Sequence, residues 1–295
     1  MKINVEKKWL YLLGLSLIWG SSFILIKKSL IGLSPLQVGS LRIVFSSIII
    51  FLIGFNKIKT IQKDKWKWIA VSAIIGTFFP AFLFAYAETQ IDSAVASILN
   101  SLVPMNTVLI GLAVFKISTT KRQSIGVIIG FIGTAVLIIS GSDLNPDQNY
   151  MYSGLVIICS ILYATNVNLI KKYLYDVNAV AIAAGQFSVI FIPSLIVLLY
   201  SDFFKIDFIN NKIILESLLY VLLLSFFGTA MAKILFNKLI QISSPVFASS
   251  VTYSMLIVSV IWGVLDGELF NSSQAIATVL IIIGVYLSNK KKPIN

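Results

Sequence analysis

The chain has 295 residues, of which 58% are hydrophobic and only 12% are charged, and its formal net charge is +11. A soluble domain of this composition would expose too much apolar surface, whereas a chain with several apolar stretches of about 20 residues can cross a bilayer repeatedly. The basic residues lie between the apolar stretches, as in membrane proteins, so no nucleic-acid partner is expected. We therefore predict an all-α integral membrane protein whose partners are membrane lipids and a small-molecule substrate.

Cysteine and histidine usage limits the chemistry further. The chain has one cysteine, Cys159, and no histidine, which excludes an internal disulfide and argues against a metal site. We expect Cys159 to be a buried apolar residue, and we expect neither a metal nor a cofactor. The charged N-terminus precedes about 20 apolar residues without a small-residue cleavage site, which favours a first membrane helix over a signal peptide.

Charged and turn-rich gaps divide the sequence into ten apolar segments. Each is long enough to cross about 30 Å of hydrocarbon as a helix, and strand-like alternation is absent. The predicted helices span 9–26, 36–55, 66–86, 94–115, 124–140, 152–170, 179–200, 213–236, 246–265 and 275–288.

The basic residues are distributed unevenly between the gaps. If the N-terminus is cytoplasmic, 17 Lys and Arg residues lie in the gaps on that side and 4 in the gaps on the other, while Arg42 and Lys233 fall within predicted helices. Short cytoplasmic loops carry an excess of Lys and Arg. We therefore predict that both termini are cytoplasmic in a multi-pass protein of the cell membrane.

A stretch near the start of the chain recurs 144 residues later. Residues 16–28 and 160–172 share a serine, a Leu-Ile pair and two terminal lysines. A unit that crosses the membrane five times has its second copy inverted when it is duplicated. The lysine pair at 27–28 therefore falls outside the cell and the pair at 171–172 falls inside. Such inverted repeats place a site near the bilayer midplane. We predict two five-helix repeats, 1–143 and 144–295.

Several short motifs occur along the chain: Trp19-Gly20-Ser21-Ser22-Phe23 with Lys27, Ser34-Pro35, Leu41-Arg42, residues 94–99 with Pro104, and Gly267-Glu268-Leu269. Together they resemble the motifs of the drug/metabolite transporter superfamily, EamA type. The resemblance covers nearly the whole chain, and it implies ten helices in two inverted repeats and transport of small organic solutes, often outward. One difference is that the first repeat has Lys116-Ile117 where the second has Gly267-Glu268, so a paired role for the acidic turn is in doubt there.

Two ionisable residues lie within predicted membrane helices, where a charge costs at least about 2.5–3.5 kcal/mol. Arg42 is about 5 Å from the middle of its helix, where it could bind a substrate carboxylate or phosphate, or donate to neighbouring helices. Gln186 occupies the matching position in the second repeat. Lys233 is three residues from its predicted helix end, where it could reach water along the lipid face or serve a substrate or gate.

Prolines mark helix breaks. Pro104 has no N–H, so the carbonyl of Asn100 loses its helical partner beside the Asn100 amide, which favours a cavity wall over a helix contact. Pro80 and Pro193 act in the same way on other carbonyls, and there a simple kink is the favoured interpretation.

The first helix of each repeat carries an aromatic residue and a polar residue on one face, which suits either a partly apolar ligand or close helix packing. These residues are Trp19 and Ser22 in one repeat and Tyr163 and Asn166 in the other. Tyr86 and Tyr253 are further aromatic candidates. The predicted substrate-binding set is therefore Trp19, Ser22, Arg42, Tyr86, Asn100, Tyr163, Asn166, Gln186, Lys233 and Tyr253.

No acidic residue falls in the middle of a predicted helix, and Glu88, Asp92, Asp266 and Glu268 are placed at or beyond the outer interface. We therefore predict a neutral to positive cavity without an evident carboxylate for proton coupling. The favoured function is a secondary transporter of an amino acid or related metabolite, more often outward, working by alternating access as a monomer or homodimer. The alternative is a membrane ligand-binding or signalling module. An enzyme is disfavoured because no acid–base pair lies in the membrane.

Overall fold

The computed structural model describes residues 2–115, 121–144, 147–205 and 211–289. The first half contains α1 (Lys2–Ser29), α2 (Pro35–Ile58), η1 (Lys63–Lys65), α3 (Trp66–Ala73), η2 (Ile74–Phe78), α4 (Phe79–Ala87), α5 (Ser93–Asn100), α6 (Val103–Phe115) and α7 (Lys121–Leu144). The second half contains η3 (Tyr150–Tyr152), α8 (Ser153–Tyr173), α9 (Ala179–Tyr200), η4 (Phe203–Lys205), α10 (Lys212–Leu223), η5 (Leu224–Met231), α11 (Ala232–Ile242), α12 (Pro245–Ser249), α13 (Val251–Leu265) and α14 (Ser272–Asn289).

The predicted all-helical membrane fold is confirmed. In the described ranges no strand occurs, and eight continuous helical stretches are long and apolar enough to cross a membrane. Two shorter apolar stretches, Ile128–Ser140 and Ser272–Gly284, lie in α7 and α14. Because only helices or closed barrels satisfy their backbone in hydrocarbon, this pattern is that of an integral membrane protein.

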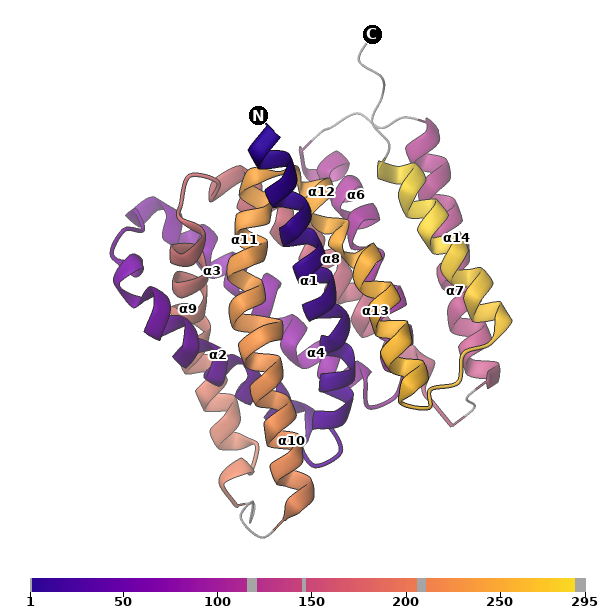
Figure 1. Ribbon diagram of the computed structural model, residues 1–295, viewed down its shortest axis with the longest axis horizontal. Coiled ribbons are helices and arrows are strands. Elements are labelled where there is room, and N and C mark those ends of the chain that lie inside the picture. The colour runs from indigo at the N-terminus through magenta and orange to yellow at the C-terminus, as the bar shows by residue number, and fades with distance from the viewer. Residues whose placement is uncertain (1, 116–120, 145–146, 206–210, 290–295) are drawn as a thin grey trace.

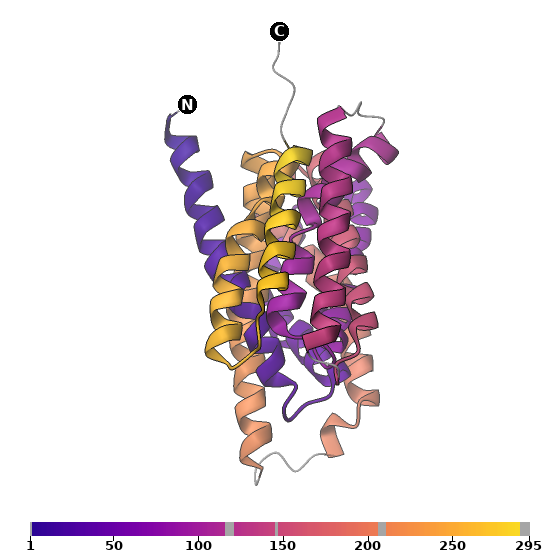
Figure 2. The same ribbon diagram turned by 90° about the vertical axis from the view of Figure 1, so that its right-hand side faces the viewer.

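The helices form a bundle in which the two halves run in opposite directions. We call the end of the bundle at which α14 finishes the upper end, which is at the top of Figure 1. The helix α1 runs down from this upper end, and α8 runs up towards it. Corresponding helices of the two halves make corresponding contacts. The helix α2 packs against α9, and α7 packs against α14 (Figures 1 and 2). The helix α1 packs against α13, and its counterpart α8 packs against α5 and α6. The division at residue 143 stays a prediction.

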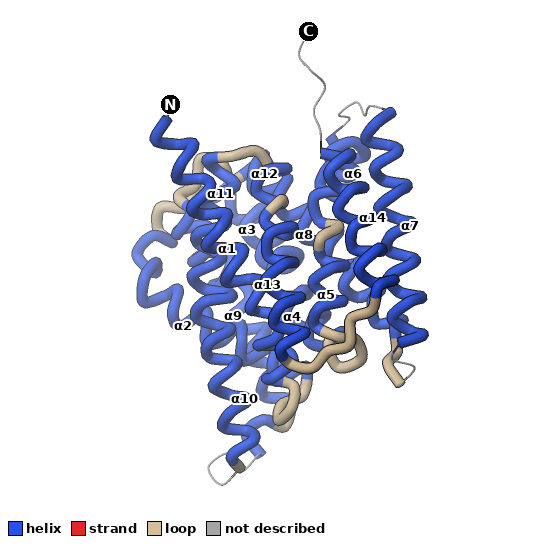
Figure 3. Tube along the Cα trace, turned by 45° about the vertical axis from the view of Figure 1, so that its right-hand side comes forward, coloured by secondary structure: helices blue, strands red, loops and turns tan. Residues whose placement is uncertain are grey.

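Glycines allow α7 and α14 to approach closely at one side of the bundle (Figure 3). A Cβ atom added at Gly284 would lie 2.6 Å from the carbonyl oxygen of Gly126, and one added at Gly133 would lie 3.0 Å from that of Ala277. Small residues let membrane helices pack backbone to backbone. The glycines of α7 therefore serve the packing of this helix against α14 in the same chain.

Four of the crossings are locally irregular, and their irregularities correspond between the halves. The third helix of each half contains a π-helical turn, η2 or η5, and the fourth helix of each half is broken, before Val103 or at Ser250. Pro104 follows the first break, and Pro80 follows η2, as expected of residues that cannot continue α-helical bonding. Pro193, in contrast, lies inside α9, which continues through it.

Most predicted boundaries agree with the helices within a few residues. The largest differences are the start of α1, at Lys2 and not Trp9, and the third crossing of the second half, which continues to Ile242 and not to Phe236. Lys233 is therefore nine residues from the end of its helix. The lone cysteine, Cys159, is fully buried in α8 against the main hydrophobic core, as expected.

Candidate functional site

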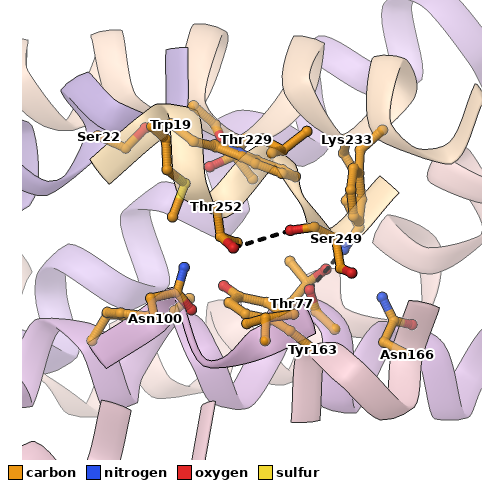
Figure 4. Close-up of a pocket in the computed structure, with 18 of the residues that line it drawn as sticks. Trp19, Ser22, Thr77, Asn100, Tyr163, Asn166, Thr229, Lys233, Ser249 and Thr252 are labelled. Carbon is orange, nitrogen blue, oxygen red and sulfur yellow. Dashed lines mark hydrogen bonds between the residues drawn. The ribbon is translucent and has the colours of Figure 1, made fainter. Parts of the chain in front are cut away.

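A cavity lies between the two halves, with about 900 Å³ of empty space that is partly open to solvent. Both first helices, the π-helical turns and the broken fourth helices contribute to its wall (Figure 4). The residues that line it are Trp19, Ser22, Phe23, Ile26, Arg42, Gly76, Thr77, Ala81, Phe84, Asn100, Val103, Tyr163, Asn166, Val167, Gly228, Thr229, Lys233, Phe236, Ala248, Ser249, Val251, Thr252 and Met255.

Two cations lie on the wall, and each donates to the opposite half of the chain. Arg42 on α2 donates from Nε to Thr229 Oγ1 at 2.7 Å, and Lys233 on α11 donates from Nζ to the carbonyl of Gly76 at 2.7 Å. Lys233 is only 7% exposed, so the alternative that it reaches water along the lipid face is wrong. No carboxylate is among the described residues of the wall, which makes the cavity electropositive.

The π-helical turns explain why backbone carbonyls are available here. Pro80 has no N–H to donate to the carbonyl of Gly76, which instead accepts from Lys233. In the other half, the carbonyl of Gly228 within η5 accepts from Trp19 Nε1 at 2.9 Å. The cavity wall therefore combines side chains with backbone acceptors that an uninterrupted α-helix would not offer.

The polar residue of each first helix packs against the glycine of the opposite π-helical turn. A Cβ atom at Gly228 would lie 2.5 Å from Ser22 Oγ, and one at Gly76 would clash with the Asn166 amide. These contacts are reciprocal, since Ser22 matches Asn166 in the repeat. Close packing and cavity lining therefore occur together at these residues.

Two polar atoms of the wall have no hydrogen-bond partner within the described part of the chain. They are Asn100 Oδ1 and Thr77 Oγ1, and both side chains are buried. In Figure 4, Trp19, Thr229 and Lys233 lie on one side of the cavity, and Asn100 lies on the other. A ligand in the cavity could therefore meet both cationic donors and free acceptors.

Seven of the ten predicted substrate-binding residues line the cavity, and Tyr86, Gln186 and Tyr253 do not. Tyr86 is 37% exposed, while Tyr253 packs against the main hydrophobic core. Gln186 is fully buried, and its Nε2 donates to Ser72 Oγ at 2.5 Å, behind the wall.

The sequence analysis missed four hydroxyl residues that line the cavity: Thr77, Thr229, Ser249 and Thr252. A signal existed for the first two. Gly76-Thr77 recurs as Gly228-Thr229, 152 residues later, in the third crossing of each half. Ser249 lies beside a helix break that no proline marks, which left the sequence without a cue.

A network of ions joins helices at the lower end of the bundle. Gly267 has φ of +86°, which a glycine adopts without strain, and its turn directs Glu268 towards the start of α5. Glu268 accepts from the backbone N–H of Ser93 at 2.9 Å and of Ala94 at 3.0 Å, and from Lys27 Nζ at 2.8 Å. The acidic turn therefore joins α13, α1 and α5.

The matching lysine at the upper end is held differently. Lys171 donates to the carbonyls of Ile240 at 3.1 Å, Gln241 at 3.2 Å and Ser243 at 2.7 Å. Backbone oxygens thus take the place that carboxylates have at the lower end. The residues that match the acidic turn, 116–117, lie outside the described residues.

Known proteins share this organisation. The EamA-like transporter family matches residues 7–139 and again residues 151–290. "Uncharacterized inner membrane transporter YedA" of Escherichia coli is 26% identical over 286 residues, which cover 94% of this chain and 88% of the relative. An "Uncharacterized transporter" of Archaeoglobus fulgidus is 25% identical over 186 residues, covering 61% of this chain and 63%, less than two thirds, of the relative.

A solved crystal structure has the same fold, with a TM-score of 0.65 and 16% identity, and the match covers 96% of each chain. The duplicated family match agrees with the two sets of corresponding irregular helices around one cavity. The chain therefore belongs to the EamA-like transporter family, as an integral membrane transporter and not an enzyme.

Proposed function

We propose that this transporter is a secondary carrier for a small organic solute with a carboxylate, such as an amino acid or a related metabolite. The observation that carries the proposal is that Arg42 and Lys233 both line a cavity whose described wall residues include no carboxylate. A carboxylate of the substrate would receive charge-assisted hydrogen bonds from these cations.

The remainder of the wall fits the remainder of such a molecule. Trp19, Tyr163 and the phenylalanines offer apolar and aromatic surface, which suits a hydrocarbon side chain. Asn100 Oδ1 and Thr77 Oγ1 can accept from an amino group. A quaternary ammonium compound would meet two cations without a counter-charge, which disfavours it.

The cations also suggest how binding is linked to movement. Arg42 and Lys233 each hold the opposite half in the absence of a substrate. A carboxylate that takes these donors would release Thr229 and the carbonyl of Gly76. Substrate binding would thereby loosen bonds between the halves, as alternating access by rocking of inverted repeats requires.

The orientation in the membrane is part of the proposal. We infer that the upper end faces the cytoplasm, with both termini on that side, because the excess of Lys and Arg lies in the loops of this end. We propose export from the cell as the physiological direction, in the cytoplasmic membrane, by a monomer or a homodimer.

Counterflow in proteoliposomes tests the substrate class. Vesicles loaded with unlabelled L-leucine, succinate or tetraethylammonium are diluted into the labelled compound. We expect saturable counterflow of leucine or succinate and none of tetraethylammonium. In Arg42→Gln the counterflow should fall about 10–100-fold, since a hydrogen bond to a charged group contributes about 1.5–3 kcal/mol.

Lys212→Gln is the matched control, because Lys212 is 90% exposed in its side chain at the lower end and should leave counterflow unchanged. Counterflow of tetraethylammonium that survives in Arg42→Gln would refute the assignment of a carboxylate substrate. Saturable binding of leucine without counterflow would refute the carrier and favour a ligand-binding module.

A further inference from the structure

Glu88 is a buried carboxyl group that the proposed function does not use. It follows the last residue of α4, and it is 6% exposed. Neither carboxyl oxygen has a hydrogen-bond partner among the described residues. The sequence placed it at the outer interface, but the fold covers it with protein.

Two acidic side chains near it at the lower end, Glu268 and Asp266, are held by donors. Glu268 accepts from Ser93, Ala94 and Lys27, and Asp266 is paired with Lys27 at 3.2 Å. A carboxylate that serves only to join helices is expected to have such partners, because a buried unpaired charge is costly. Glu88 thus differs from its neighbours in the feature that would make it structural.

The charges that act on Glu88 come from three elements packed around it. Lys27 on α1 and Arg42 on α2 favour its ionised form, while Glu268 in the turn after α13 opposes it. The helix α8 packs against α4, and its neutral side chains of Tyr163 and Cys159 act on Arg42. Burial, with the charge of Glu268, outweighs the two cations and raises the pKa of Glu88 well above its ordinary value.

Glu88 is also close to the cavity along its own helix. Phe84, one turn before it on the same face of α4, lines the cavity and stacks on the ring of Tyr163. Arg42, one of the two charges that favour the Glu88 carboxylate, is the cation proposed to bind the substrate. A change of charge at Glu88 would therefore be felt where an anion binds.

We propose that Glu88 is a proton-binding site linked to anion binding at Arg42. With Glu88 ionised, its negative charge offsets that of the guanidinium; with Glu88 protonated, the full positive charge is available to a carboxylate. The carboxylate takes up one proton and no other bond changes. Because linkage is reciprocal, a bound anion raises the affinity of Glu88 for that proton.

The first experiment needs no substrate, so it is independent of the proposed function. Infrared titration of the purified protein in lipid nanodiscs follows the C=O stretch of protonated carboxyl groups. We expect one such band in the wild type to titrate at a pH well above that of an ordinary carboxyl group, and Glu88→Gln to lack it. Glu216→Gln is the matched control, since the side chain of Glu216 is 58% exposed, and it should keep the band. Identical titrations of the wild type and Glu88→Gln would overturn the proposal.

The second experiment tests the linkage, which rests on the proposed function through Arg42. Binding of L-leucine is measured in weak buffer with a pH-sensitive dye, at and above the pH at which the infrared band titrates. We expect proton uptake on binding there, and an affinity that rises up to about tenfold for each unit of falling pH while free Glu88 is ionised. Glu88→Gln should bind leucine without either effect.

The possible failures are distinguishable. Leucine binding by the wild type without proton uptake overturns the linkage, even if the infrared band is present. If neither leucine nor succinate binds to the wild type, the proposed substrate class fails, and the infrared titration alone decides whether Glu88 holds a proton.

Discussion

Glu268 offers the clearest test of how helices are joined at the lower end. Its side chain is 2% exposed and accepts from Ser93 N at 2.9 Å, Ser93 Oγ at 2.6 Å, Ala94 N at 3.0 Å and Lys27 Nζ at 2.8 Å. In Glu268→Gln the amide nitrogen cannot accept from a backbone N–H, and the charge that faces Lys27 is lost. Removing one partner from a buried ionic network costs about 3–5 kcal/mol.

We expect this loss to appear as a lower Tm of the solubilised protein. At roughly 2–4 °C for each kcal/mol, a loss of about 3 kcal/mol lowers Tm by about 6–12 °C. Thermal unfolding followed by tryptophan fluorescence measures the change. Glu216→Gln makes the same substitution in an exposed i,i+4 pair with Lys212, at 3.8 Å, and should leave Tm unchanged. A Glu268→Gln protein with the Tm of the wild type would refute the description of this network as a stabilising contact between helices.

Three further outcomes follow from the contacts. Gly228→Ala places a Cβ atom 2.5 Å from Ser22 Oγ and should lower the free energy of unfolding by about 1–3 kcal/mol, measured by thermal unfolding. Gly14→Ala is the control, because no atom lies within 4 Å of its added Cβ, and it should not destabilise the protein. Equal Tm values of the two variants would contradict the close contact at Gly228. Although burial acts to raise the pKa of Asp266, hydrogen bonds from two lysines outweigh it and hold that pKa below its usual value. Its contribution to stability is therefore present above the unfolded-state pKa and is lost as the pH falls through the lower folded-state pKa. The Tm of Asp266→Asn should thus lie below that of the wild type at neutral pH, and this difference in Tm should shrink at acidic pH. Lys171→Met removes donors to three carbonyls at the upper end and should increase labelling there by a water-soluble thiol reagent at an introduced cysteine; unchanged labelling would show that these bonds do not close this end.

The sequence predicted the fold well because its signals are local. Apolar length located the eight long helices and the two shorter apolar ones, and missing N–H groups located two irregular helices. The predicted break at Pro193 is wrong, since α9 continues through it. The break at Ser250 was not predicted, since no residue there lacks a backbone donor. Arg42 and Lys233 were identified because charge in an apolar segment is rare, but the helix end beyond Lys233 was placed too early, at Phe236, before the charged Lys238.

The side chains around the cavity were harder to assign, because their roles depend on the contacts between halves. Gln186 matches Arg42 by position, yet it bonds to Ser72 and lies behind the wall. Glu88 was placed at the interface because it follows an apolar segment, whereas its burial depends on helices distant in sequence. Such a residue can be recognised only when the packing around it is known.

The single cysteine has a practical consequence for following motion in this transporter. Cys159 is fully buried inside α8, and the sequence contains no other thiol. A polar maleimide should therefore leave the native protein unmodified, so that a cysteine introduced at either end reports the water exposure of its own position. The two ends of the bundle can thus be compared in an otherwise unaltered chain.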